Sequence, residues 1–357
     1  MLVHGGCTAT HEHEVKASSI VYVRTDSDAT TVISPTVSAA GQASDQVGVS
    51  ASYTVDAWTG ASIDVVTAAT SAIRERRHEG QLGVSYDDGT LRVMGRYRGS
   101  YEHDYQSHGI VVSASRDFAR HNTTLSGAVM GSGDTAGRSG DPNFAEPVGT
   151  GGFQLGLSQV LGERTIASVS WETDTVSGYQ ASPYRWVAVG GDGTCASTAP
   201  FCLPEHTPDT RVRNSASGHV RRAVGERAST GLDYRYYFDS WGIRSHTVEP
   251  SLTWVVSDAT SLTLHYRYYA QREADFYRPR YFHFDDGGGY LTRDRKLSAF
   301  FANEVGAAYS HAWEFDDGDR QIDLGLRASL SRIDYLAYVG LVAVNALELT
   351  TMVSLGF

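Results

Sequence analysis

The sequence predicts an all-β chain that folds as a single transmembrane antiparallel β-barrel of about sixteen strands, with short periplasmic turns and long outer loops. Three observations lead to this prediction. Apolar and polar residues alternate in segments of about ten residues or more throughout the chain. Charged residues stand well inside these segments, on the polar face. Short turns and long connections alternate between the segments.

The composition argues against several other classes of protein. The chain has 357 residues, of which 41% are hydrophobic and 11% aromatic. Its longest apolar stretch, Tyr335 to Val344, has about half of the 18 residues that a membrane-spanning helix needs. A formal net charge of −11 argues against nucleic-acid binding, so no nucleic-acid partner is expected.

Period-two alternation is the main signal for strands. Segments 47–56, 91–101, 262–271 and 322–331 place apolar or aromatic side chains at alternate positions and mostly polar ones between them. Successive side chains of a strand point to opposite faces, so each segment has one apolar and one polar face. A soluble β-sandwich gives the same alternation, but its strands average nearer six residues, whereas crossing a bilayer takes about ten.

The connections between segments sort into two kinds. Tight turns rich in Gly and Asp are expected at residues 87–89, 161–164, 224–227, 257–259 and 315–319. Longer insertions are expected at residues 59–78, 132–150, 177–209 and 272–296. If the chain forms about sixteen strands, all these tight turns fall at one end of the barrel and all these insertions at the other.

The end of the chain predicts a closing strand. Apolar side chains fill most alternate positions from Leu347 to Phe357, and the chain ends on an aromatic residue. A terminal Phe357 resembles the closing-strand signal that outer-membrane barrels present to the barrel assembly machinery. That machinery and outer-membrane lipid are therefore the expected partners. We expect residues 1–15 to form a flexible N-terminal segment and residues 16–357 to form the barrel.

The cysteines and the first residues bear on the compartment. Cys195 and Cys202 flank a short stretch within a region rich in Gly, Pro and Thr, and their spacing predicts a local disulfide in an oxidising compartment. Two free thiols are the alternative, and Cys7 is left over. Residues 1–6 lack the basic and apolar stretches of a signal peptide, so the expected outer-membrane location does not rest on them.

Arginines and carboxylates on the polar faces are the main functional candidates. In a barrel these side chains face the hollow interior. We call them the lumen set: Arg92, Arg96, Arg98, Arg211, Arg213, Arg221, Arg235, Arg267, Arg327, Asp56, Glu172, Asp233, Asp239, Glu249, Glu304 and Asp323. A mixed ring of charges can select solutes by charge. Alternatively, the same charges pair across the lumen and seal it.

The sequence offers little for catalysis, metal binding or cofactor binding. Ser245, His246 and Glu249 are close in sequence, but His246 and Glu249 are expected on opposite faces of one strand, and there is no G-x-S-x-G elbow. His11 and His13 form only a weak H-x-H pair near the N-terminus. We therefore expect no enzymatic activity, no metal and no cofactor.

Three segments resemble motifs of a family of Gram-negative outer-membrane proteins known only as a domain of unknown function. The first is similar to a PE-x-x-PD-x-R loop, the second to a hairpin motif around the DSWG segment, and the third to a motif beginning YRYY. The motif residues are Pro204, Glu205, Pro208, Asp209, Arg211, Trp241, His246, Asp275 and Tyr277. The resemblance spans about residues 16–357, and it implies an outer-membrane barrel without implying an activity.

Two functions are compatible with the sequence. The first is a porin-like channel for small solutes, with a lumen lined by arginines and carboxylates. The second is a non-conducting barrel that anchors or sheathes another envelope component, such as a lipoprotein or a redox partner. Residues 59–78 combine apolar residues with a basic end. This segment either folds into the barrel mouth as a constriction or forms an outer loop.

Overall fold

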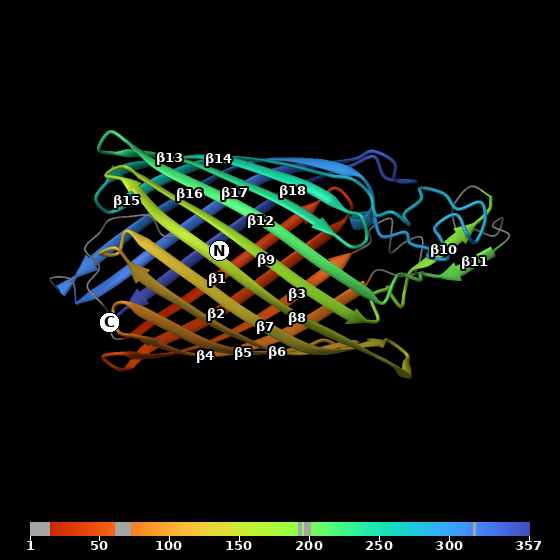
Figure 1. Ribbon diagram of the computed structural model, residues 1–357, viewed down its shortest axis with the longest axis horizontal. Helices are drawn as coiled ribbons and strands as arrows, with labels where there is room; N and C mark the ends of the chain where they lie inside the picture. Colours follow the sequence, from red (N-terminus) through yellow and green to blue (C-terminus); the bar gives the residue numbers. More distant parts are fainter. Residues whose placement is uncertain (1–14, 61–72, 192–194, 196–200, 317–318) are drawn as a thin grey trace.

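The protein is a closed β-barrel of sixteen antiparallel strands (Figure 1). The computed structural model describes residues 15–60, 73–191, 195, 201–316 and 319–357. Around the barrel the strands follow one another in chain order, and β9 pairs with β12 because β10 and β11 form a separate two-stranded sheet. The predicted fold class and strand number are confirmed.

The barrel strands are long, as bilayer crossing requires. The first nine are β1 (Val15–Asp26), β2 (Thr30–Ser44), β3 (Val47–Gly60), β4 (Ile73–Asp87), β5 (Leu91–Tyr101), β6 (Tyr105–Phe118), β7 (Thr123–Arg138), β8 (Asp141–Gly162) and β9 (Thr165–Gly178). The other seven are β12 (Thr210–Val224), β13 (Ala228–Asp239), β14 (Arg244–Ser257), β15 (Thr260–Gln271), β16 (Phe300–Phe315), β17 (Arg320–Tyr335) and β18 (Ala343–Gly356). Outside the barrel lie β10 (Trp186–Val189), β11 (Phe201–Pro204) and the 3₁₀ turn η1 (Arg295–Leu297).

The first and last strands close the cylinder. β1 pairs with β18 from Lys16 opposite Gly356 to Asp26 opposite Ala346. The backbone N–H of Phe357 also donates to the carbonyl oxygen of Val15, at 3.0 Å. Closure leaves no sheet edge, and a hydrocarbon environment demands this because lipid tails satisfy no backbone hydrogen bonds.

The alternation predicted from the sequence separates the two faces of the wall. On β6, Ile110 and Val112 are exposed on the outside, whereas Ser113 lies on the opposite, inner face. The outer surface as a whole carries exposed leucines, valines and aromatic residues, such as Leu82, which is 63% exposed. An apolar outer face of this kind is typical of barrels that sit in lipid. Among the described residues, no helix is long and apolar enough to span a membrane.

The two ends of the barrel differ. The turn end, where β1 starts and β18 finishes, holds the predicted tight turns at 87–89, 161–164, 224–227 and 257–259 and the connection from β16 to β17. The loop end holds the long connections, including the two that run from β9 to β12 and from β15 to β16. In Figure 1 the C-terminus marks the turn end on the left, and β10 and β11 project from the loop end on the right. The predicted sorting of connections is confirmed.

One predicted insertion is wrong. Residues 132–150 were expected to form a long loop, but β7 continues to Arg138 and β8 begins at Asp141, so the segment is a hairpin. Its strands stay paired from Ser132 opposite Thr150 to Gly137 opposite Ala145. Ala136 and Val148 pack with Val176 of β9, and this burial stabilises a stretch whose glycines hide the usual alternation. The expected insertion at 59–78 is shorter than predicted, because residues 59–60 end β3 and residues 73–78, with the basic end of the segment, begin β4. Residues 61–72 lie outside the described part of the chain.

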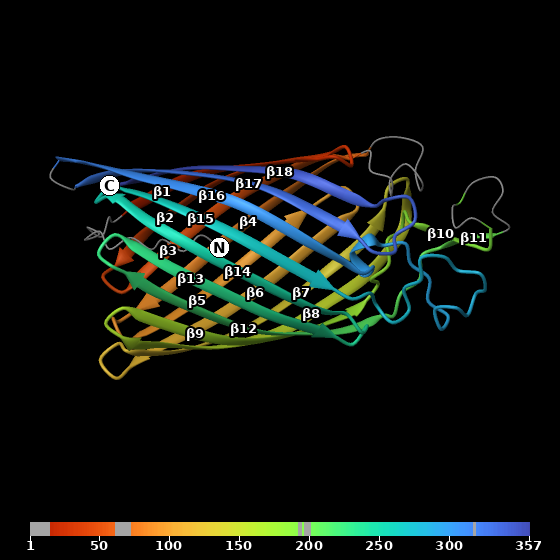
Figure 2. The same ribbon diagram turned by 90° about the horizontal axis from the view of Figure 1, so that it is seen from above.

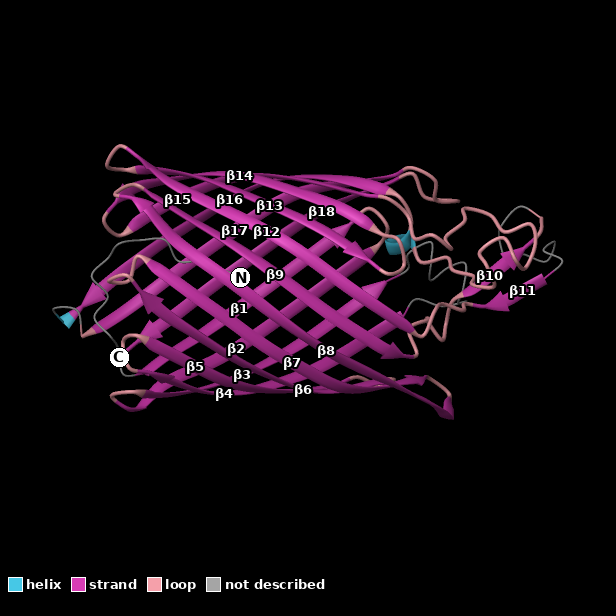
Figure 3. Cartoon of the chain, viewed as in Figure 1, coloured by secondary structure: helices cyan, strands magenta, loops and turns pink. Residues whose placement is uncertain are grey.

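The long connections pack into a structure that we call the cap, namely the described residues of 179–209 and 272–299. Figures 2 and 3 show β10, β11 and the loops beside them projecting beyond the loop end. Val187 and Val189 of β10 pack with Tyr281 and Leu291, so the two connections share an apolar cluster. A second cluster joins Trp241 and the β15–β16 connection to the β17–β18 connection. Burial of these side chains holds the outer loops together.

Candidate functional site

The interior of the barrel is the candidate site. On β13, Asp233 and Arg235 alternate with the exposed Leu232 and Tyr234, so the two charges face inward. The same comparison with exposed apolar neighbours places every residue of the lumen set on the inner face of its strand. The alternation along each strand decides this. If the register of a strand shifted by one residue, its charged side chains would lie on the outer face.

A charged network covers the inner face of β14 to β17. The guanidinium of Arg267 lies 3.9 Å from a carboxylate oxygen of Glu249 and 3.9 Å from one of Glu304. Arg327 lies 3.7 Å from Glu304, and the Nε2 atom of His265 lies 3.3 Å from the same carboxylate. The ring of His265 lies over Gly306, where a Cβ would collide with it. Arg267 and Arg327 remain 43% and 42% exposed, so water reaches this network.

A second group of charges lies on β9, β12 and β13. Arg235 approaches Glu172 at 3.8 Å, and Asp233 hydrogen-bonds the Nδ1 atom of His219. The Nε atom of Arg221 donates to the Nε2 atom of His219 at 2.9 Å. Within the part of the chain that the structure describes, neither Arg213 nor Arg221 has a carboxylate within 4.0 Å.

The charges of β3 to β6 lie toward the two ends of the barrel. At the turn end, Arg92 contacts Asp87 at 2.8 Å and Asp117 at 3.6 Å. Nearer the loop end, Arg98 contacts Glu79 at 2.8 Å, and the Nε atom of Arg77 donates to Asp56 at 2.9 Å.

Two members of the lumen set have partners outside these groups. Arg96 contacts only the sulfur of Met94 among the described side chains, at 3.6 Å. Asp323 pairs with Lys16 of β1 at 3.6 Å.

Several inner-face residues were missed by the sequence analysis. Lys16, Arg77, Glu79, His219 and His265 all contact members of the lumen set. Each stands an even number of residues from an inward-facing neighbour on its own strand, so strand parity was the signal that could have found them. Their partners could not be found this way, because cross-strand contacts depend on the register of the sheet.

Arg211 and Asp239 are the exception within the lumen set. The side chain of Asp239 is fully buried and accepts hydrogen bonds from the backbone N–H groups of Trp241 at 2.9 Å and Ile243 at 3.0 Å. Arg211 donates to the same carboxylate and lies 4.4 Å from the centre of the Trp241 ring. This pair fixes the β13–β14 turn at the loop end.

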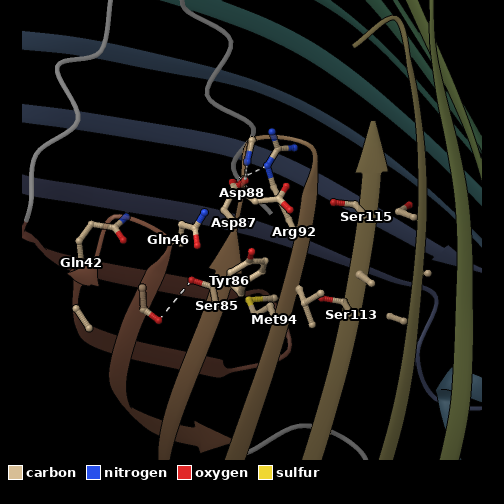
Figure 4. Close-up of a pocket in the computed structure, with 18 of the residues that line it drawn as sticks. Gln42, Gln46, Ser85, Tyr86, Asp87, Asp88, Arg92, Met94, Ser113 and Ser115 are labelled. Atoms are coloured by element: carbon tan, nitrogen blue, oxygen red, sulfur yellow. Dashed lines mark hydrogen bonds and ion pairs between the residues drawn. The ribbon is translucent and has the colours of Figure 1, made fainter. Parts of the chain in front are cut away.

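A cavity of about 1370 Å³ occupies the lumen near the turn end (Figure 4). Its wall comes from β2 to β8 and is mostly small and polar, with Gln42, Ser85, Ser113, Ser126 and Gln154 among the lining residues. Within the wall, glycine and serine pack closely. At Gly48, for example, an added Cβ would lie 2.7 Å from the hydroxyl oxygen of Ser85. Four charged residues also line the cavity: Asp45, Asp87, Asp88 and Arg92.

Glu205, the motif residue of the PE segment, organises the cap. Its carboxylate contacts Arg185 at 2.9 Å, accepts from the backbone N–H of Ser182 at 2.7 Å and accepts from the hydroxyl of Thr292 at 2.6 Å. These contacts join the two long connections of the cap. Burial raises the pKa of the Glu205 carboxyl, and the nearby Arg185 guanidinium opposes that shift.

The other motif residues lie at or near the loop end. Pro204 ends β11, the carbonyl of Pro208 accepts from Gln180 at 3.4 Å, and the carbonyl of Asp209 accepts from the N–H of Gly178 at 2.9 Å. Asp275 donates its backbone N–H to the carbonyl of Trp241 at 2.8 Å, and Tyr277 is buried in the same cluster. His246 is different, because it stands on the outer face of β14.

The two cysteines near β10 and β11 are joined in the structure. Cys195 and Cys202 form a disulfide with their Cα atoms 5.7 Å apart, within the usual range for a disulfide. The bridge closes a short segment of the cap. Cys7 lies outside the described residues.

The described residues offer no centre for metal or nucleophilic chemistry. No group of three or more His, Cys, Asp or Glu side chains there is arranged to hold a metal ion. Ser245 and Glu249 lie on the inner face of β14, but His246 points outward from the same strand. His11 and His13 lie outside the described residues.

Comparisons with known proteins agree with this architecture. The model of the family described as "Protein of unknown function (DUF3570)" matches residues 67–146 and 143–326. No curated protein matches the chain. The chain is similar to the solved structure of a bacterial polysaccharide outer membrane secretin, with 10% identity, a TM-score of 0.56, and 97% of this chain and 99% of that chain covered. A weaker likeness, with 8% identity and a TM-score of 0.49, is to OccD3 of Pseudomonas aeruginosa, covering 99% of this chain and 93% of that one.

Proposed function

This chain belongs to the DUF3570 family, and we propose that it is an outer-membrane channel through which small polar solutes diffuse. The loop end faces outward and the turn end faces the periplasm, because barrels of this type carry short turns and both chain ends on the periplasmic side. The apolar outer face is in contact with lipid. The charged inner face is in contact with water.

The cavity inside the barrel is the observation that carries the proposal. A cylinder of sixteen strands is wide enough to leave an aqueous channel, whereas one of about eight is filled by its own side chains. Here about 1370 Å³ of interior space lies against a wall of small polar residues. This space supports a lumen that its own side chains leave open at the turn end.

The arrangement of charge supports selection by electrostatics. The half-exposed network around Arg267 and Glu304 lies on β14 to β17, and the serine-lined wall lies on β2 to β8. A solute in the lumen therefore meets a charged network on β14 to β17 and, near the turn end, hydroxyl and amide groups together with Arg92 and Asp87. Such a lining favours small polar solutes that exchange part of their hydration shell for contacts with the wall.

Conductance measurements test the proposal. Purified full-length protein is reconstituted into planar bilayers in KCl solution, and the current is recorded at fixed voltage. An open lumen gives discrete ion-current steps, and liposomes containing the protein swell in small sugars faster than in large ones. Folded protein that inserts and passes neither ions nor sugars contradicts the channel and favours a non-conducting barrel that anchors or sheathes another envelope component.

A further inference from the structure

Three histidine–tyrosine pairs recur on the outer face of the barrel. The hydroxyl oxygen of Tyr53 lies 2.7 Å from the Nδ1 atom of His78, and the same distance separates Tyr97 from His108. Tyr234 and His246 repeat the contact, again at 2.7 Å. In each pair the two residues come from neighbouring strands and sit diagonally across the ladder.

The contact orients each imidazole ring. A tyrosine hydroxyl that donates to Nδ1 leaves the ring proton of a neutral histidine on Nε2. All three histidines are exposed, so in this tautomer their Nε2–H groups face a ligand outside the barrel. Apolar lipid tails offer no acceptor for such a donor, whereas headgroups do.

The three histidines lie in the part of the wall nearer the loop end. His78, His108 and His246 stand in the first half of β4, β6 and β14, and each of these strands starts at the loop end. In the orientation of the proposed function, this part of the wall faces the outer leaflet. The inference rests on that orientation.

Arginines reinforce two of the three positions. Arg76 and Arg244 are exposed and stand two residues before His78 and His246, on the same outer face and nearer the loop end. Two residues along a strand span about 7 Å. Neither arginine has a carboxylate within 4.0 Å in the described part of the chain. Together an arginine and an imidazole N–H match the donors that a phosphate group attracts.

Among the residues that the structure describes, the outer face at the turn end lacks this combination. His311 of β16 is also on the outer face, but its Nδ1 atom pairs with the hydroxyl of Thr260, at 2.7 Å, and Trp313 packs against its ring. The residue two positions farther toward the turn end is Trp313, which carries no charge. His311 therefore serves as a natural control for an outward-facing histidine.

We propose that the Tyr–His pairs at the loop end, with Arg76 and Arg244, bind the phosphate groups of a phosphorylated glycolipid of the outer leaflet. The tyrosine hydroxyl fixes the ring, the Nε2–H donates to a phosphate oxygen, and the arginine supplies the positive charge. Sites on opposite parts of the wall, at β3–β6 and at β13–β14, allow more than one lipid to bind.

The test compares one glycolipid with and without its phosphates. Full-length protein in detergent is titrated with bisphosphorylated lipid A and with the same lipid after enzymatic dephosphorylation, and bound lipid is counted by native mass spectrometry. The wild type is expected to bind the phosphorylated lipid at least about tenfold more tightly. The triple variant H78F/H108F/H246F and the double variant R76Q/R244Q are expected to lose that preference, while inorganic phosphate fails to compete.

Controls make the outcome decisive. H311F keeps the preference of the wild type, and all variants keep the heat-dependent gel shift of a folded barrel. Equal binding of both lipids by the wild type overturns the proposal, and so does an unchanged preference in both multiple variants. Bilayer conductance is measured on the same samples, so a barrel that conducts ions without a lipid preference refutes this inference and leaves the channel intact.

Discussion

The cap and the lumen use the same residue types, yet their ion pairs are built differently. In the cap and at the loop-end rim, the side chains of Glu205 and Asp239 are 2% and 0% exposed, and each accepts several hydrogen bonds. In the lumen network of Arg267 and Arg235, the partner carboxylates of Glu172, Glu249 and Glu304 are 34%, 31% and 16% exposed, and these contacts are 3.8 to 3.9 Å long. Burial, rather than residue type, separates the two groups.

This difference assigns different consequences to similar side chains. Removing one partner of a buried pair leaves an uncompensated charge and is strongly destabilising. A half-exposed pair is screened by water and contributes little to stability. We therefore expect substitutions in the cap to damage the structure of the outer loops, and substitutions in the lumen to change ion flow while leaving the fold intact.

The largest effect is expected at Glu205. Glu205→Ala removes the buried carboxylate that Arg185 and Thr292 share, while Asp294 still lies 3.5 Å from Arg185, at a cost of about 3 kcal/mol to the cap. Hydrogen exchange of the described cap residues should accelerate, while exchange in the barrel strands stays slow. Glu249→Ala, in the lumen, is the matched control, and equal protection of the cap in both variants would contradict the comparison.

A smaller structural effect is expected at Gly306. An alanine there collides with the ring of His265, so the ring must leave the wall of the lumen, at a cost of about 1–3 kcal/mol. Gly306→Ala should lower the midpoint of thermal unfolding, followed by the gel shift. Gly218→Ala, where an added Cβ meets nothing within 4 Å, should leave the midpoint near that of the wild type.

Arg267 tests the lumen side of the comparison. Arg267→Gln should change stability by less than about 1 kcal/mol, because the guanidinium is hydrated and its ion pairs are long. It should make the channel more selective for cations, since it removes a positive charge beside Glu249 and Glu304. The reversal potential in a KCl gradient measures this change. Glu249→Gln should shift the reversal potential in the opposite direction. Shifts of the same sign in both variants would contradict selection of ions by the charges of the lumen.

The smallest effect is expected at Asp88, in the β4–β5 turn. Backbone N–H groups of Leu91 and Thr90 donate to its carboxylate and hold its pKa below the usual value. Because the folded state lowers this pKa, the carboxylate contributes stability above the unfolded pKa of about 3.9, and the contribution is lost as the pH falls. Asp88→Asn should lower the midpoint of thermal unfolding slightly at pH 7. In acid, where the wild-type carboxylate is protonated, the variant and the wild type should have the same midpoint.

Much of the fold could be predicted from the sequence because a barrel wall obeys a period of two. The alternation around Asp233 and Arg235 alone fixes which residues face inward. The hairpin at residues 132–150 was missed because its glycines interrupt the pattern, and burial of Val148 against Val176 stabilises it instead. Contacts between strands, such as Arg267 with Glu304, depend on register and lay beyond sequence reasoning.

The sequence predicts which face of a strand a charged side chain lies on, but not whether that side chain is buried. Arg211 and Asp239 share the parity of the lumen set, yet the Trp241 turn buries them. The sequence marked Glu205 only through a family resemblance, and its connection to Arg185 and Thr292 needs the folded loops. Burial arises from packing of distant segments, so a local pattern does not contain it.

Current block at two adjacent residues tests the open lumen most directly. In a Cys7→Ser background, Ser113→Cys places a thiol in the cavity, whereas Val112→Cys places one on the outer face of the same strand. A bulky, water-soluble thiol reagent should reduce the single-channel current of the Ser113 variant and leave that of the Val112 variant unchanged. A Ser113 variant whose current is unaffected while its thiol is labelled, or a folded barrel that carries no current at all, would contradict the account.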